Sequence, residues 1–393
     1  MLATAALILT GCGGPAAQPP TSAASSVLPS APPPQSPSPA VPSLSGAPAP
    51  AGDCATQTLA GLSLEQRVGQ LLMIGVPVLN PRGLAGTVTR YQLGGIFLAG
   101  RSQRPAAALR GDIATLQAAA GMPLLVALDQ EGGSVQTLKG NDFPAIPSAL
   151  RLGAGPPATL RAEVQDAAHR LAGIGVNVNL APVADTVPAE LGEGNPPIGA
   201  FHRQYGSDPT QVATAIRTVV ATSQEAGVLT TIKHFPGLGR TRFNTDTTSR
   251  AVDATTTAQD PYLGPFVAGI KAGSAAVMVS SASYPLLDPK AIAAFSEPII
   301  TGLLRRDLGF TGLVLSDDLG AATAVRAVPV GDRAVRFVRA GGDLVLTIRS
   351  SDAGPMSAAL LAAAQKSPAF TDRVTDAATH VLQAKVRAGL LTC

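Results

Sequence analysis

Charged residues stand at the ends of several short apolar segments of this chain. Asp129 follows one segment, Asp185 lies just beyond another, Lys233 and His234 end a third, and Asp317 follows a fourth. A charged group that is buried without a partner is costly, so side chains in such positions are usually paired or used for chemistry. The repeated arrangement therefore predicts that these residues meet in one functional site.

The residue types in this set favour glycoside hydrolysis. One carboxylate can attack the anomeric carbon or activate water, while another group protonates the leaving oxygen. Neighbouring Lys, Arg and His side chains would bind sugar hydroxyls through charge-assisted hydrogen bonds. The sequence has no G-x-S-x-G motif that would indicate an acyl-transfer triad, and no ligand spacing typical of a metal site.

Eight short apolar segments recur along the chain and are expected to position these groups. Most are continuously apolar, as strands buried on both faces should be, and stretches of helical period separate them. This alternation predicts an α/β protein with a single (β/α)₈ TIM barrel, whose strands all end at one mouth; a doubly wound open sheet is the alternative. The segments are Leu71–Val76, Gly95–Leu98, Leu124–Leu128, Val176–Leu180, Val228–Ile232, Ala276–Ser280, Leu313–Leu315 and Asp343–Ile348.

The distribution of charge separates a leader from a globular body. The chain has 393 residues and a formal net charge of +3, and its first charged residue is Asp53. We predict a lipoprotein signal peptide over 1–12, a disordered Pro/Ala/Ser-rich tether over 13–52 and a catalytic barrel over 53–393. The absence of Trp and of long runs of like charge argues against nucleic-acid binding.

The first twelve residues are apolar but too short to span a bilayer, as in a secretory signal. The stretch Leu9-Thr10-Gly11-Cys12 resembles a bacterial lipobox, which implies cleavage before Cys12 and lipidation of its thiol. We therefore expect an extracytoplasmic protein that is anchored to the cell membrane through this lipid alone. A disordered N-terminus with a chance cysteine is the alternative.

Two further cysteines lie at the two edges of the body, at Cys54 and Cys393. Domain termini are often close in space, and an exported protein meets oxidising conditions. If Cys12 carries lipid, these two cysteines remain as a pair, and we predict a disulfide between them. Two separate surface thiols are the alternative.

Five motifs, in order along the body, carry a resemblance to a known family. They are Asp129-Gln130-Glu131-Gly132-Gly133, Asn179-Leu180-Ala181-Pro182-Val183-Ala184-Asp185, Lys233-His234-Phe235-Pro236-Gly237, Ser283-Tyr284-Pro285 and Ser316-Asp317-Asp318-Leu319. Together they resemble the motifs of glycoside hydrolase family 3, in particular the NagZ-type β-N-acetylglucosaminidases. The resemblance implies a retaining mechanism on a single barrel, no cofactor, and substrates that are GlcNAc-containing glycans or muropeptides. We expect a monomer.

The resemblance also implies roles for individual residues. Asp317 matches the nucleophile, which would form a covalent glycosyl-enzyme. Asp129, Arg203, Lys233 and His234 match residues that bind the GlcNAc hydroxyls. Lys and Arg donate hydrogen bonds to hydroxyl lone pairs, and a carboxylate accepts from hydroxyl hydrogens, so these residue types suit a sugar.

The chain departs from the family in the loop after Gly237. There the family has an Asp-Ser-His sequence whose His is the acid/base, oriented by the Asp. Here Asp246 matches the Asp, but Thr248 stands in place of the His. Asp246 is therefore a candidate acid/base or a partner within its loop; as acid/base it would need a raised pKa, from apolar Phe243 or from the charge of Asp317. A turn-forming role for Asp246 is the alternative.

The leading hypothesis is a retaining exo-β-N-acetylglucosaminidase that removes terminal GlcNAc from peptidoglycan fragments during cell-wall turnover. One alternative is a catalytically weakened lipoprotein that binds muropeptides or sugars, as loss of the family His would permit. A β-N-acetylglucosaminide phosphorylase and a β-glucosidase of the same family are further alternatives. The β-glucosidases match less well, because they typically place Trp after the nucleophile where Asp318 stands.

Overall fold

The computed structural model describes residues 51–393, with side chains from Cys54 onward. Cys12 and residues 13–50 of the predicted tether lie outside the described residues. The first helix, α1 (Ala51–Ala60), begins before the predicted domain boundary at Asp53. The first charged residue marks this boundary only approximately, because Ala51 favours a helix without carrying charge.

Eight parallel strands form one sheet in which each strand is hydrogen-bonded to its neighbour. A parallel bridge between Leu315 and Leu344 joins the two ends of the sheet and nearly closes it into a barrel. This confirms the predicted (β/α)₈ barrel and excludes the open sheet. In sheet order the strands are β11 (Leu313–Ser316), β8 (Ala276–Val279), β7 (Leu229–Phe235), β6 (Val178–Asn179), β3 (Leu125–Leu128), β2 (Gly95–Ala99), β1 (Leu72–Pro77) and β12 (Val345–Thr347).

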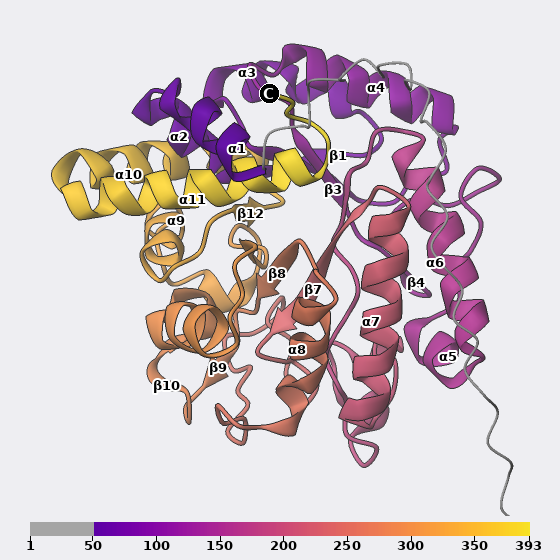
Figure 1. Cartoon of the computed structure of the whole chain (residues 1–393). Helices are drawn as coiled ribbons and strands as arrows, with labels where there is room; N and C mark the ends of the chain where they lie inside the picture. Colours follow the sequence, from indigo (N-terminus) through magenta and orange to yellow (C-terminus); the bar gives the residue numbers. More distant parts are fainter. Residues whose placement is uncertain (1–50) are drawn as a thin grey trace, which may run out of the picture. The chain divides into compact units, whose positions relative to one another are not determined.

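Helices lie outside the strands and complete the alternation (Figure 1). The chain enters α2 through a capping box, in which the Ser63 hydroxyl accepts from the Gln66 N–H and the Gln66 side chain accepts from the Ser63 N–H. The helices are α2 (Leu64–Gln70), α3 (Ala85–Tyr91), α4 (Ala106–Ala119), α5 (Ala149–Ala154), α6 (Pro157–Ala172), α7 (Pro209–Glu225), α8 (Gly264–Lys271), the π-helix η6 (Pro298–Asp307), α9 (Val330–Arg339), α10 (Ala353–Lys366) and α11 (Pro368–Arg387). None of the helices in residues 51–393 is long and apolar enough to cross a membrane.

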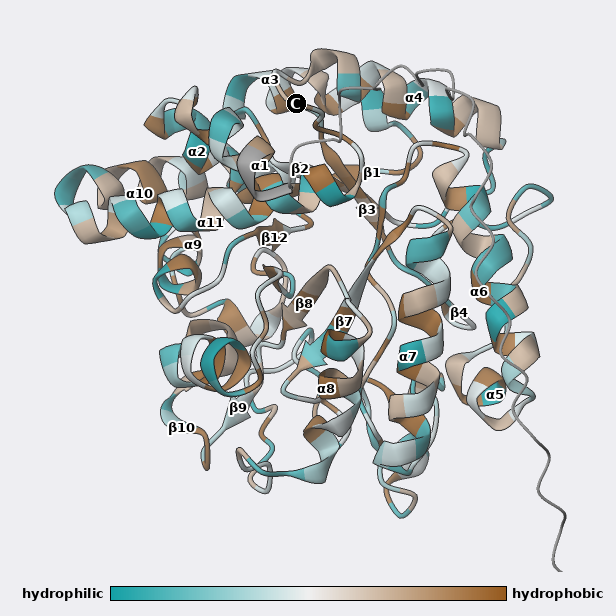
Figure 2. Cartoon of the chain, viewed as in Figure 1, coloured by the Kyte–Doolittle hydropathy of each residue, from teal (hydrophilic) through white to brown (hydrophobic). Residues whose placement is uncertain are grey.

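Most strand residues are apolar because both faces of the strands are buried, as the largely brown strands of Figure 2 indicate; β7, with Thr230, Thr231, Lys233 and His234, is the exception. In β3, Leu125 and Ala127 point into an inner cluster, while Val126 and Leu128 pack in the outer core. This is the alternation of a strand between a barrel interior and a layer of helices. Continuous apolarity in the sequence was therefore the correct indication of strands covered on both sides.

The two ends of the described chain lie together. α1 packs against α11, and Cys54 forms a disulfide with Cys393, with 5.5 Å between their Cα atoms. Val381 and Ala384 of α11 pack against the inner cluster of the barrel. The last helix therefore contributes to the barrel core, and the disulfide fixes the chain just beyond it.

Candidate active site

A cavity of about 230 Å³ lies where the barrel strands end. Four residues of the inner apolar cluster also line this cavity and form its apolar base. They are Phe97, Leu180, Met278 and Leu346. The polar part of the wall contains every residue predicted to act in catalysis or sugar binding. These residues are Asp129, Arg203, Lys233, His234, Asp246 and Asp317.

Three polar groups of this wall, Asp129, Arg203 and Lys233, form one connected network of charges with Glu131 behind them. Lys233 Nζ lies 2.6 Å from Asp129 Oδ1 and 2.5 Å from Glu131 Oε1. Arg203 holds Glu131 through two parallel hydrogen bonds of 2.8 Å, from Nε and Nη2. Burial alone would raise the pKa of Glu131, but the charges of Arg203 and Lys233 lower it to about 2. Glu131 therefore stays ionised and holds Arg203 and Lys233 as fixed hydrogen-bond donors beside the cavity.

The sequence did not identify Glu131 as a site residue, although it belongs to the motif of Asp129. Its side chain is buried and faces the two cations, whereas Asp129 remains partly open to the cavity. The signal in the sequence was a second carboxylate two residues after the first, at the end of the same strand. Glu131 is best described as the residue that positions Arg203 and Lys233.

Lys233 and His234 are adjacent in β7, yet both side chains line the cavity. The pairing of β7 with β8 shifts register between Ile232 and Phe235, so regular alternation does not hold here. The fully buried Asp185 lies 2.7 Å from His234 Nδ1. Because the Asp185 carboxylate accepts a hydrogen bond, it favours the His234 tautomer that carries its proton on Nδ1. The other ring nitrogen, Nε2, then has no proton and can accept from Arg203 Nη2, 3.4 Å away.

Asp317 directly follows β11 and lines the cavity. Its backbone N–H donates to the Val279 carbonyl at 3.0 Å, and its Oδ1 accepts from the Asp318 N–H at 2.8 Å. The Asp318 carboxylate accepts from the backbone N–H groups of Gly320 and Ile348, at 2.8 and 3.0 Å. Asp318 therefore stabilises the turn that holds Asp317 at the end of its strand.

Asp246 lies at the open rim of the same cavity, on the loop after β7. Burial of its carboxyl group, together with the negative charge of Asp317, raises the pKa of Asp246 to about 6, while His234 and Arg203 oppose the shift. The Thr323 and Ala324 N–H groups donate to the Asp246 and Thr245 carbonyls at 3.2 and 3.0 Å. The loop that carries Asp246 is therefore attached to the segment that follows Asp317.

Two further residues of this loop, Phe243 and Thr248, are not among the described residues that line the cavity. Of the two causes expected for the raised pKa of Asp246, the charge of Asp317 is one that acts here; the Phe243 ring is 39% exposed and packs under the Arg250 guanidinium, 4.6 Å from its centroid. Thr248 accepts from the Arg250 N–H at 3.2 Å and is not among the described residues that line the cavity. The position that holds His in the family therefore contributes no group to the cavity here.

The chain is similar to known proteins in sequence and in fold. The family model "Glycosyl hydrolase family 3 N terminal domain" matches residues 63–384. A curated beta-hexosaminidase of Xanthomonas oryzae pv. oryzae is 38% identical over 244 residues, which cover 59% of this chain and 70% of that protein. The structure of a beta-N-acetylhexosaminidase from Beutenbergia cavernae is 48% identical with a TM-score of 0.81, covering 83% of this chain and 99% of that one. LpqI of M. tuberculosis is 27% identical with a TM-score of 0.71, covering 84% and 95%.

Proposed function

The chain belongs to glycosyl hydrolase family 3, and from that premise we propose that it is a retaining exo-β-N-acetylglucosaminidase that acts on peptidoglycan fragments. One observation supports this proposal above all others. Two carboxyl groups, Asp317 and an Asp246 whose pKa is raised, share one cavity with the side chains of Arg203 and Lys233. Retaining hydrolysis commonly uses such a pair of carboxyl groups, one as nucleophile and one as acid/base.

In the first step, an Asp317 oxygen attacks the anomeric carbon while the bond to the leaving oxygen breaks. Asp246 gives its proton to that oxygen, so the leaving group departs as a neutral alcohol. Lys233, Arg203 and Asp129 hold the ring hydroxyls and orient the anomeric carbon toward Asp317. The product of this step is a glycosyl ester on Asp317 and an ionised Asp246.

The second step reverses the roles. Once Asp317 is esterified it is neutral, and its charge no longer raises the pKa of Asp246. Asp246 is then better suited to remain ionised and to take a proton from the attacking water. Water adds to the anomeric carbon, Asp317 leaves as a carboxylate, and Asp246 is protonated again. The charge of Asp317 thus favours a protonated Asp246 before the first step, and the loss of that charge favours an ionised Asp246 before the second.

The activity is tested with p-nitrophenyl β-N-acetylglucosaminide and p-nitrophenyl β-glucoside assayed side by side. We expect faster release of p-nitrophenol from the GlcNAc substrate, and loss of that activity in Asp317→Asn. Asp307→Asn, which changes an exposed carboxylate outside the cavity, should keep it. Preference for the glucoside would favour a β-glucosidase, and a requirement for phosphate would favour phosphorolysis. Tight binding of GlcNAc without turnover would favour a binding protein.

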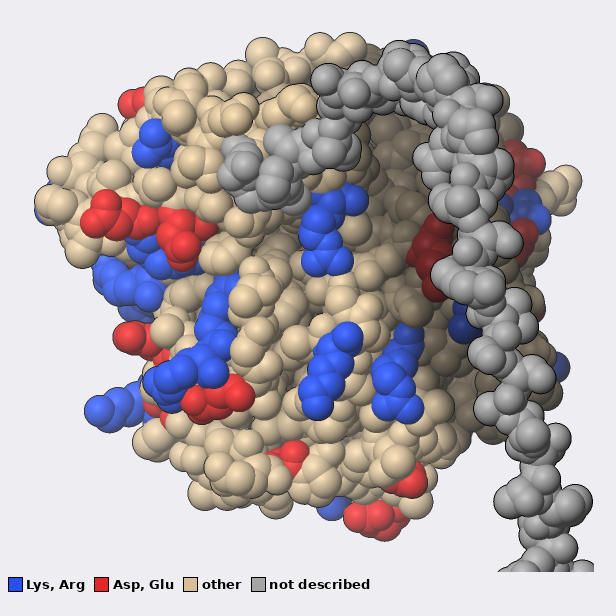
Figure 3. All heavy atoms as spheres, in the orientation of Figure 1, with Lys and Arg blue, Asp and Glu red and all other residues tan. Residues whose placement is uncertain are grey.

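We also propose that the protein is anchored outside the cytoplasmic membrane through lipid on Cys12. The lipobox-like Leu9-Thr10-Gly11-Cys12 and the uncharged Pro-rich sequence after it support this proposal. The charged side chains on the face seen in Figure 3 lie interspersed among uncharged ones, so that face offers no extended single-sign surface for an anionic membrane. Cys12→Ala should move the protein from the detergent phase to the aqueous phase; unchanged partitioning would contradict the anchor.

A further inference from the structure

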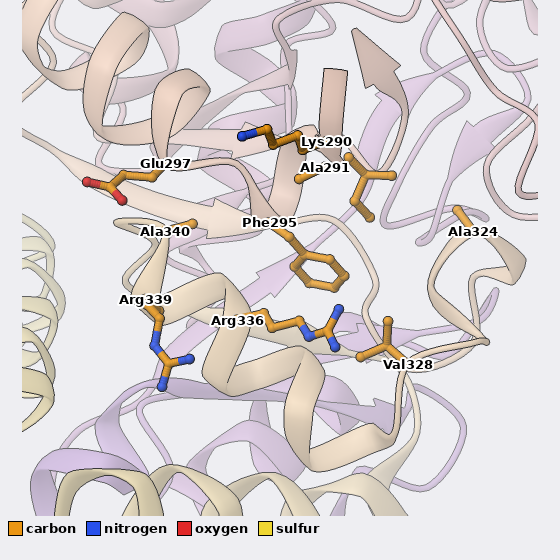
Figure 4. Close-up of a pocket in the computed structure, with 10 residues that line it drawn as sticks. Lys290, Ala291, Phe295, Glu297, Ala324, Val328, Arg336, Arg339 and Ala340 are labelled. Atoms are coloured by element: carbon orange, nitrogen blue, oxygen red, sulfur yellow. The ribbon is translucent and has the colours of Figure 1, made fainter. Parts of the chain in front are cut away.

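A second cavity, of about 370 Å³, is formed by residues other than those of the catalytic mouth. It lies between β10 (Asp288–Ile292), which pairs with β9 (Ser283–Tyr284), together with the segment after β10, and helix α9 (Figure 4). Ile292, Phe295 and Val328 give it an apolar wall. A cavity of this size with apolar walls is suited to a small organic molecule.

The same cavity is lined by three cations, Lys290, Arg336 and Arg339, against one carboxylate, Glu297. Arg305 and Arg373 nearby in the fold both pair with Asp343. In residues 54–393, by contrast, none of the three cavity cations belongs to an ion pair. Figure 4 shows Arg336 reaching beside the Phe295 ring toward Val328, while Glu297 points away from the cavity. An exposed guanidinium without an ion-pair partner among the described residues thus lies next to an aromatic and aliphatic wall.

We propose that this cavity binds a small amphipathic organic anion. Its carboxylate or sulfonate pairs with Arg336, with Lys290 as a second cation at the rim, and its apolar part contacts Phe295 and Val328. Such a ligand gains binding free energy from two sources. Its anionic group forms a charge-assisted contact with Arg336, and its apolar part removes the surface of Phe295 and Val328 from water. Residues 1–52 contain no charged side chain, so they do not supply an anionic side chain to this cavity.

The cavity is connected to the catalytic loop by one short segment, η7 (Thr323–Val325). Ala324 lines the cavity, and its N–H donates to the Thr245 carbonyl at 3.0 Å, next to Asp246. A ligand that packs on Ala324 therefore restrains the segment that holds the Asp246 loop. We expect occupancy to change the turnover of the enzyme, a consequence that rests on the proposed function, whereas binding itself does not.

Binding is tested with 1-anilinonaphthalene-8-sulfonate, an amphipathic anion whose fluorescence rises in apolar sites. N-phenyl-1-naphthylamine is the matched probe without the charge. Arg336→Gln should weaken sulfonate binding by about tenfold or more, as expected for loss of a charge-assisted contact, and leave the uncharged probe unaffected. Arg217→Gln, on the exposed side of α7, is the control and should bind both probes as the wild type does. Equal sulfonate affinity in wild type and Arg336→Gln, or an equal loss in both variants, would overturn the proposal.

Turnover of p-nitrophenyl β-N-acetylglucosaminide is then measured with and without saturating sulfonate probe. We expect kcat to change in the wild type and not in Arg336→Gln. Unchanged kcat in a wild type that binds the probe would overturn the connection through η7. If no variant hydrolyses the substrate, the proposed function fails, while the fluorescence titration still decides whether the cavity binds anions.

Discussion

Asp185 Oδ2 lies 2.7 Å from His234 Nδ1, and the carboxylate of Asp185 is fully buried. The other oxygen, Oδ1, accepts from the backbone N–H groups of His234 and Leu238, at 3.2 and 2.8 Å. One carboxylate therefore fixes the His234 ring, the end of β7 and the start of the loop that carries Asp246. We infer that Asp185 is a positioning residue for both the sugar-binding and the acid/base side of the cavity.

Replacement of Asp185 by Asn should reduce kcat/KM for p-nitrophenyl β-N-acetylglucosaminide by about tenfold to a hundredfold. The reason is that hydrogen bonds to a charged group contribute about 1.5–3 kcal/mol, and the neutral amide weakens three of them. Asp288→Asn is a matched control, because Asp288 is also buried and accepts hydrogen bonds but does not line the cavity. Wild-type kinetics in Asp185→Asn would show that the pair has no role in positioning.

The pH dependence of catalysis should report the protonation of Asp246. Since burial and Asp317 raise the pKa of Asp246 to about 6, the proton needed by the leaving oxygen is present below that pH and is lost above it. We expect kcat/KM to fall as the pH rises through about 6. Asp246→Asn should turn over more slowly and lose this limb of the profile.

Thr248→Ala serves as the control for the same loop. It should keep the wild-type turnover rate and the fall of kcat/KM as the pH rises. A profile of Asp246→Asn that matches the wild type would assign Asp246 to a structural role in its loop.

Much of this site could be predicted because parallel strands of a barrel end at one mouth. Asp129, Lys233 and Asp317 are recognisable as charges that follow apolar strands, and the structure places them together. The partnership of Glu131 with Arg203 could not be predicted, since it depends on the direction of side chains that are 72 residues apart. The contact of Phe243 with Arg250 could not be predicted either, because hydrophobicity suggests burial, whereas here the guanidinium lies over an exposed ring.

The disulfide should contribute measurably to stability, because it joins residues 339 positions apart and so restricts the unfolded chain strongly. Loss of a native disulfide typically costs about 2–5 kcal/mol. Cys54→Ser should therefore lower the urea midpoint, and Cys54→Ser/Cys393→Ser should lower it by about the same amount, since either change removes the same bond. A midpoint equal to that of the oxidised wild type would contradict a stabilising role.

Lys385 should make stability depend on pH. It is buried and donates to Gln70 Oε1, and burial lowers the pKa of its amine to about 7. Between pH 7 and about pH 10 the unfolded chain then binds more protons than the folded one, so stability rises with pH by up to about 1.4 kcal/mol per unit. Below pH 7 the amine is protonated in both the folded and the unfolded chain, and the folded chain bears the full free-energy cost of a buried charge.

Lys385→Met removes the titrating group and should lack this slope. Urea denaturation of both proteins from pH 6 to pH 10 measures the difference. Parallel pH dependence in the wild type and Lys385→Met would show that the buried amine does not titrate in this range.

The most direct test of the catalytic proposal is to trap the glycosyl-enzyme with 5-fluoro-N-acetylglucosaminyl fluoride and to locate the adduct by peptide mass spectrometry. We predict one added 5-fluoro-GlcNAc unit on the peptide that contains Asp317, and no adduct in Asp317→Asn. An adduct on a different carboxylate, or hydrolysis of the reagent without any adduct, would contradict the assignment of Asp317 as the nucleophile.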